Sequence, residues 1–123
     1  MFQKLIIAGH CGGEPSMRYT VDGKPVTSFS VATSRKYNDK EETSWFRVSV
    51  WGNQAESCNQ YLRKGSKVLV EGRLDPDKNT GAPKVFQKKD GSWGASYEVF
   101  ADTVRFLNDS GKSDDAPYDD VPF

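Results

Sequence analysis

Apolar and polar residues alternate along several short segments of this chain, as they do in strands that bury one face. The pattern is clearest over residues 45–51, WFRVSVW, where Phe46, Val48 and Val50 occupy every second position. Residues 5–9, 26–35, 66–74 and 96–107 show apolar runs or similar alternation, separated by segments rich in Gly, Pro and Asp. The chain therefore predicts about five strands.

Turn signals separate these strands and add one more hairpin. Asp22-Gly23 predicts a tight turn within residues 21–25, and residues 38–42 predict a charged loop. Residues 84–93 predict a hairpin around Asp90-Gly91.

One segment has helical spacing instead. After residue 52, Ala55, Cys58, Tyr61 and Leu62 fall on one face of a helix. Asn53 is expected to cap this helix, with Glu56 three residues later, and Gly65 is expected to end it.

The order of these elements favours an all-β fold, a five-stranded OB-fold barrel with one helix between strands three and four. A sheet of this size must close or be covered to protect its edges. A β-sandwich is the alternative, although a lone helix after the third strand suits it poorly. Residues 1–107 are expected to form the barrel domain.

The net charge of zero conceals two different parts. Residues 1–107 hold 16 Lys and Arg against 12 Asp and Glu, whereas residues 108–123 hold five Asp and one Lys. The second segment has too few apolar groups to offset its ordering entropy. It is therefore predicted to be a disordered acidic tail.

Several classes of function are disfavoured by composition. Two cysteines, Cys11 and Cys58, indicate free thiols rather than a disulfide scaffold, and the single histidine with no Cys-x-x-Cys argues against a metal site. The sequence shows neither paired carboxylates on a defined face nor a nucleotide-binding loop, so an enzyme is not expected. The residues at the start of the sequence do not suggest a secretory signal, so none is expected, and the sequence contains no apolar run of about 20 residues for a membrane span. We expect no cofactor and no metal.

The second face of residues 45–51 carries Trp45, Arg47, Ser49 and Trp51. Flat Trp and Arg groups stack well on unpaired bases, at about 1–3 kcal/mol per base, and Arg47 can also meet a phosphate. The alternative is that both tryptophans cover a second small core or a subunit interface.

Further basic and aromatic residues gather in other segments. Each cluster alone is typical of a solvated surface, but several on one small barrel favour a basic groove with aromatic steps. Such a groove binds a single-stranded nucleic acid, whereas an OB-type module for protein or saccharide would use the tryptophans differently. The candidates are Arg35, Lys36, Tyr37, Arg73, Lys84, Phe86, Lys88 and Lys89.

Taken together, these motifs resemble the bacterial-type single-stranded DNA-binding protein family over nearly the whole chain. The strand and helix motifs and an acidic segment that ends in Pro122-Phe123 carry the resemblance. The segments concerned are residues 4–9, 12–15, 18–20, 29–33, 45–52, 55–56, 61–66, 70–74, 101–107 and 119–123.

The resemblance implies an OB-fold protein that assembles as a homotetramer and binds single-stranded DNA without sequence preference. It implies base stacking by Tyr37, Trp45, Trp51 and Phe86, and a cytoplasmic, nucleoid-associated role in DNA replication, recombination and repair. It also implies recruitment of replication and repair proteins through a tip formed by Asp119, Asp120, Val121, Pro122 and Phe123.

Overall fold

The computed structural model describes residues 1–107, which form seven strands and one helix. The tail and partner-binding tip expected within residues 108–123 lie outside the described residues. The elements are β1 (Leu5–Cys11), β2 (Ser16–Tyr19), β3 (Pro25–Tyr37), β4 (Lys40–Trp51), α1 (Asn53–Tyr61), β5 (Lys67–Leu74), β6 (Lys84–Gln87) and β7 (Trp93–Phe106).

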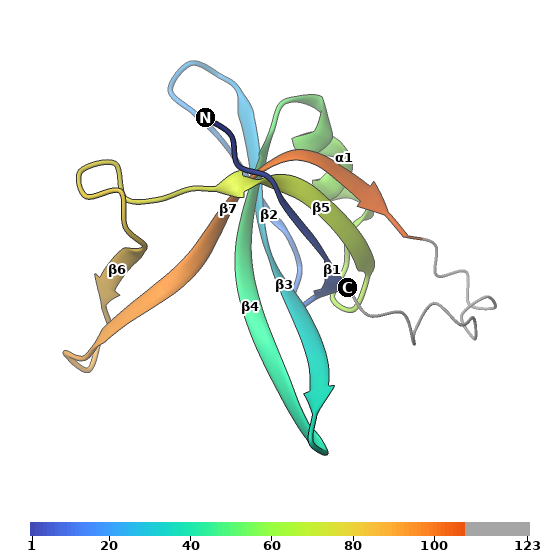
Figure 1. Ribbon diagram of the computed structural model, residues 1–123. Helices are drawn as coiled ribbons and strands as arrows, with labels where there is room; N and C mark the ends of the chain where they lie inside the picture. Colours follow the sequence, from blue (N-terminus) through green and yellow to red (C-terminus); the bar gives the residue numbers. More distant parts are fainter. Residues whose placement is uncertain (108–123) are drawn as a thin grey trace.

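Five of these strands close into a barrel (Figure 1). The sheet runs in the order β1-β5-β7-β4-β3, and β3 pairs back to β1 at His10–Ala32 and Cys11–Val31. Only β4 and β7 pair in parallel among these strands. The short strands β2 and β6 extend the edges of β3 and β7. The predicted OB-fold barrel is confirmed, with α1 between its third and fourth strands, and the β-sandwich is excluded.

The barrel core consists of the inward side chains predicted from alternation. Val48 and Val50 of β4 are at most 1% exposed, as are valines of β3, β5 and β7. Helix α1 closes one end of the barrel with Ala55 and Cys58, and Leu62 follows it into the core. The Thr27 hydroxyl donates a hydrogen bond of 2.6 Å to the Ala55 carbonyl, which ties the helix to β3.

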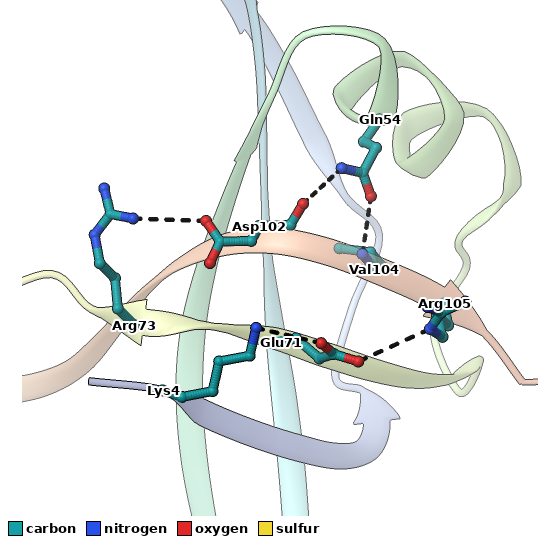
Figure 2. Close-up of polar contacts among 7 residues, drawn as sticks. All are labelled: Lys4, Gln54, Glu71, Arg73, Asp102, Val104 and Arg105. Atoms are coloured by element: carbon teal, nitrogen blue, oxygen red, sulfur yellow. Dashed lines mark hydrogen bonds and ion pairs between the residues drawn. The ribbon is translucent and has the colours of Figure 1, made fainter. Parts of the chain in front are cut away.

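Gln54 joins the helix to β7 where the pairing of β5 and β7 shifts register (Figure 2). The bulge lies between Glu71 and Gly72. Its extra residue on β7 is Asp102, whose carbonyl accepts a 2.8 Å bond from the Gln54 amide nitrogen. The Val104 N–H donates to the Gln54 amide oxygen at 2.9 Å. One side chain thus satisfies backbone groups that the irregular ladder would otherwise leave unpaired.

The helix boundaries differ from those predicted. Gly52, with φ 76° and ψ −144°, is the N-cap, so Asn53 is the first helical residue, and no side chain among residues 1–107 caps the N-terminus of the helix. Because Trp51 still pairs with Val26, the chain must reverse sharply at residue 52, in a conformation that favours glycine. The helix ends at Tyr61 rather than near Gly65, since Leu62 turns to an extended conformation and is buried.

The prediction of a charged loop at residues 38–42 is also wrong. Asn38 and Asp39, with φ 54° and 64°, form a two-residue turn of the kind in which both central residues need positive φ. Strands β3 and β4 therefore pair out to Tyr37–Lys40. Together they form a long arm that projects from the barrel (Figure 1). The hairpin predicted at residues 84–93 is confirmed as β6 and the start of β7.

The helix length and the grouping of possible metal ligands bear on membrane and metal functions. The one helix among residues 1–107 has nine residues, and none there is long and apolar enough to cross a membrane. Within the same residues, no three His, Cys, Asp or Glu side chains are grouped so that they could hold a metal ion.

Gly9 is required by the close approach of β1 and β3, and we predict that Gly9→Ala destabilises the protein. A methyl group there would overlap the backbone of Ala32, so the barrel must open locally. We expect a loss of about 1–3 kcal/mol in the free energy of unfolding, measured by urea denaturation. Gly13→Ala is the matched control, since a methyl at Gly13 meets nothing within 4 Å. Equal stability of the two variants would contradict the close approach.

The two buried thiols make stability depend on alkaline pH. Burial, with a smaller effect from Glu14, raises the pKa of Cys11 from 9.0 to about 11. Burial, followed by Cys11, raises that of Cys58 to about 12. The unfolded chain therefore loses thiol protons before the folded chain does, and the stabilisation present below pH 9.0 is lost progressively above it.

We predict that the urea concentration at the midpoint of unfolding decreases when the pH is raised from about 8 to about 10.5. The decrease should be smaller in the double variant Cys11→Ala/Cys58→Ala. The comparison separates the effect of the thiols from that of every other ionisable group, because the two proteins share the rest of the chain. An identical pH dependence of the two proteins would show that the thiols do not contribute.

Candidate functional site

The outward side chains of β3, β4 and β7 form one face with a regular grid. Ser30, Arg47 and Glu98 lie side by side on the three strands, because Arg47 pairs with both of the others. Two residues further along β4, Ser49 pairs with Phe100. Trp45 and Trp51 lie at either end of this part of β4.

Both tryptophans lie on the outside of the barrel. Trp45 is 55% exposed and Trp51 is 40% exposed, whereas their neighbours Val48 and Val50 are buried. This exposure excludes a second core within the described residues. Trp45 rests on Gly12, where any side chain would overlap its ring. The glycine therefore gives the indole a flat backbone support and leaves its other surface open.

The Trp51 ring stacks on a second aromatic ring, that of Phe100. The two rings are nearly parallel, 8° apart, with centroids 6.0 Å apart. The Arg73 guanidinium lies 4.8 Å from the centre of the Phe100 ring and pairs with Asp102 at 3.5 Å (Figure 2). This stack fixes the orientation of Trp51 through packing and a cation–π contact.

A hollow of about 380 Å³ lies between the barrel and the β6–β7 hairpin. Phe86 of β6 forms one side, and it packs over Gly94 on the paired strand. Trp45 and Arg47 line the hollow from β4. Sequence positions far apart are thereby brought together. The lining residues are Ser30, Trp45, Phe46, Arg47, Phe86, Ser96 and Glu98.

The candidate cations differ in their partners. Arg35 pairs with Glu42 at 3.5 Å, and the Lys84 ammonium lies 3.1 Å from Asp75 and 3.9 Å from Glu98. Among residues 1–107, Arg47 forms no ion pair, and the same is true of Lys36, Lys88 and Lys89. Among the candidate cations in the described residues, these four exposed side chains remain available for an anionic ligand.

The remaining candidates lie on two arms, the β3–β4 arm and the β6–β7 hairpin, rather than beside the hollow. Arg35, Lys36 and Tyr37 occupy the outer end of the β3–β4 arm, and only Lys36 shares the face of Arg47 by alternation. Lys88 and Lys89 lie in the turn of the β6–β7 hairpin. Figure 1 shows the two arms projecting in different directions from the barrel.

Sequence reasoning did not identify Phe100, Glu98 or Gly12 as parts of this site. Phe100 could have been found, because it is an aromatic residue on the polar side of an alternating strand, as Trp45 is. Gly12 and Glu98 gave no such signal. Their roles arise from contacts between strands that are distant in sequence.

Exposed aromatic rings can stack on planar rings of a ligand, while unpaired cations beside them bind its phosphate groups. Comparison with known proteins agrees with this chemistry. Residues 2–107 match the single-strand binding protein family.

Several relatives are similar over much of the chain. One is the single-stranded DNA-binding protein of Neisseria meningitidis serogroup B, 35% identical over 123 residues, covering 95% of this chain and 67% of that protein. The protein of the same name from Xanthomonas campestris pv. campestris is 37% identical over 114 residues, with coverage of 89% and 62%. Single-stranded DNA-binding protein 1 of Chlorobaculum tepidum is 40% identical over 90 residues, with coverage of 66% and 56%. The chain thus aligns with 56–67% of the length of these relatives.

Proposed function

This chain belongs to the single-strand binding protein family, and from this premise we propose that it binds single-stranded DNA without reading its sequence. The observation that supports the proposal best is the outer face of β4, where two exposed tryptophans flank an unpaired arginine. Duplex bases are stacked on one another and are not available to these rings. A single strand is therefore the ligand that this face suits.

In the proposed complex, aromatic rings take the bases and cations take the phosphates. Trp45, Trp51, Phe86 and Tyr37 are the stacking residues, all between 40% and 63% exposed. Arg47 is the central phosphate contact because it has no partner in the described part of the chain. Lys36, Lys88 and Lys89 extend the basic track, while Arg35, Arg73 and Lys84 contribute less since carboxylates already hold them.

We propose further that the protein acts by binding rather than by catalysis, in the cytoplasm and in association with the nucleoid. Its role there is to protect exposed single strands during replication, recombination and repair. Residues 119–123 recruit the proteins that work on those strands. This acidic segment, with Pro122 and Phe123, suits an apolar pocket rimmed by basic side chains.

Assembly into a homotetramer is also proposed. Within residues 1–107, β1 pairs with β5 from Leu5 to His10 but with β3 only at His10 and Cys11. The first half of β1 therefore presents a backbone edge, and the adjacent Ile6 side chain is 58% exposed. Pairing with another copy would cover both.

Removal of either indole tests the stacking. We expect Trp45→Ala and Trp51→Ala each to weaken binding of a poly-pyrimidine strand by about 1–3 kcal/mol, because each loses one stacked base. Fluorescence anisotropy with a labelled oligonucleotide measures the affinity. Tyr19→Ala is the control, since Tyr19 is 61% exposed but lies on β2. Unchanged affinity in both tryptophan variants would refute the stacking.

The salt dependence of binding tests the role of Arg47. Each phosphate contact contributes about −0.7 to the slope of log K against log salt for a single strand. We expect Arg47→Ala to make the slope less steep by about that amount. Lys4→Ala is the control, since Lys4 pairs with Glu71 beside β1 and β5. Figure 2 shows that Glu71 also pairs with Arg105. Equal slopes for Arg47→Ala and the unaltered protein would remove this contact.

Deletion of residues 119–123 tests partner recruitment separately. In pull-down experiments, the truncated protein should fail to retain replication and repair proteins, which are identified by mass spectrometry. Its affinity for DNA should stay equal or rise, because negative charge is lost. A control with Asp114→Asn and Asp115→Asn removes charge and keeps the tip. Undiminished partner recovery by the truncated protein would show that the tip is not required.

A further inference from the structure

We propose that the Glu98 carboxylate accepts a hydrogen bond from the amino group of a base held in the hollow, so that cytosine is bound there more tightly than uracil or thymine. This inference rests on the proposed function, because it assigns a base preference to the same surface. It adds a weak preference to a binding mode that is otherwise independent of sequence.

The position of Glu98 in the hollow suggests this role. Glu98 lies on β7 directly beside Arg47 of β4, and both line the hollow together with the Trp45 and Phe86 rings. The side chain retains 21% exposure and is thus accessible from the hollow. A base placed against an aromatic ring here would present its polar edge near an acceptor and its phosphate near a cation.

The carboxylate has room for another hydrogen bond. One oxygen of Glu98 accepts a 2.8 Å bond from the Ser96 hydroxyl. The other lies 3.9 Å from the Lys84 ammonium, which is closer to Asp75, at 3.1 Å. A carboxylate has about four acceptor sites, so these contacts leave free acceptor capacity. Lys84 is held mainly by Asp75 and takes up only part of the acceptor capacity of Glu98.

The two pyrimidine types differ in what they offer to this group. Cytosine carries an amino donor at the ring position where uracil and thymine carry a carbonyl oxygen. An ionised carboxylate only accepts hydrogen bonds, so it attracts the amino group and repels the carbonyl oxygen. Carboxylate recognition of the cytosine amino group is a known mode of base reading. The ring area for stacking is similar, so the polar edge decides.

Short oligo(dC) and oligo(dU) of equal length provide the test, because uracil lacks both the amino group of cytosine and the methyl group of thymine. We expect the unaltered protein to bind oligo(dC) about fivefold or more tightly, at the lower end of the range for base contacts because the hollow is open to water. Glu98→Gln should bring the ratio close to one, because an amide can donate to uracil as well as accept from cytosine. It should also raise oligo(dU) affinity.

Two further variants separate base reading from general charge effects. Glu71→Gln removes the charge of a carboxylate that pairs with Lys4 and Arg105 and does not line the hollow, so it must keep the dC-to-dU ratio. Glu98→Asp keeps the charge but withdraws the carboxylate by one methylene, and should lower the ratio without raising oligo(dU) affinity. Thermal denaturation followed by circular dichroism checks that each variant is folded.

The results distinguish the inference from the function on which it rests. A ratio near one in the unaltered protein, an unchanged ratio in Glu98→Gln, or an equal loss of the ratio in Glu71→Gln would overturn the role of Glu98. In each of those cases salt-dependent binding of both oligonucleotides would leave the proposed function intact. Failure to bind either oligonucleotide would overturn both.

Discussion

The period of two along β4 is the constraint on which this site depends. Val48 and Val50 point into the barrel and the partly buried Phe46 packs against the same core, so burial of the two valines fixes the strand in one register. The intervening side chains must then point outward. A slip by one residue would place Trp45 and Arg47 in the core and expose the valines, at a cost no small barrel could sustain. The core thus determines the outer face.

Barrel closure and glycine then shape the surface that the outer face presents. The parallel pairing of β4 and β7 places Arg47 beside Glu98 and brings the β6–β7 hairpin within reach of Trp45. Gly12 and Gly94 leave flat backbone beneath Trp45 and Phe86. Rings supported in this way lose little further freedom on binding, which favours stacking of a ligand over collapse of the rings onto each other.

Much of the fold and part of the site were predictable from the chain alone. The strand at residues 45–51 has an unbroken pattern, and its two faces were assigned correctly from alternation. The turn at Asn38-Asp39 was not, because charged residues flank it and only the cross-strand pairing of Arg35 with Glu42 shows why they form strands. The cap at Gly52 was missed because Asn53 has the better local signal, whereas the tight reversal after Trp51 decides. Local patterns therefore predicted strands and faces, and contacts between distant segments decided the ends, the glycine supports and the state of each cation.

The most direct test of this account is the intrinsic tryptophan fluorescence of the full chain during titration with a single-stranded poly-pyrimidine oligonucleotide and with a duplex of the same length. Stacked bases quench exposed indoles, and Trp45 and Trp51 are exposed. We expect strong, saturable quenching by the single strand, much weaker quenching by the duplex, and a smaller signal when Trp45 and Trp51 are replaced by Phe. Emission that is unchanged by the single strand would contradict the claim that these two rings form a platform for unpaired bases.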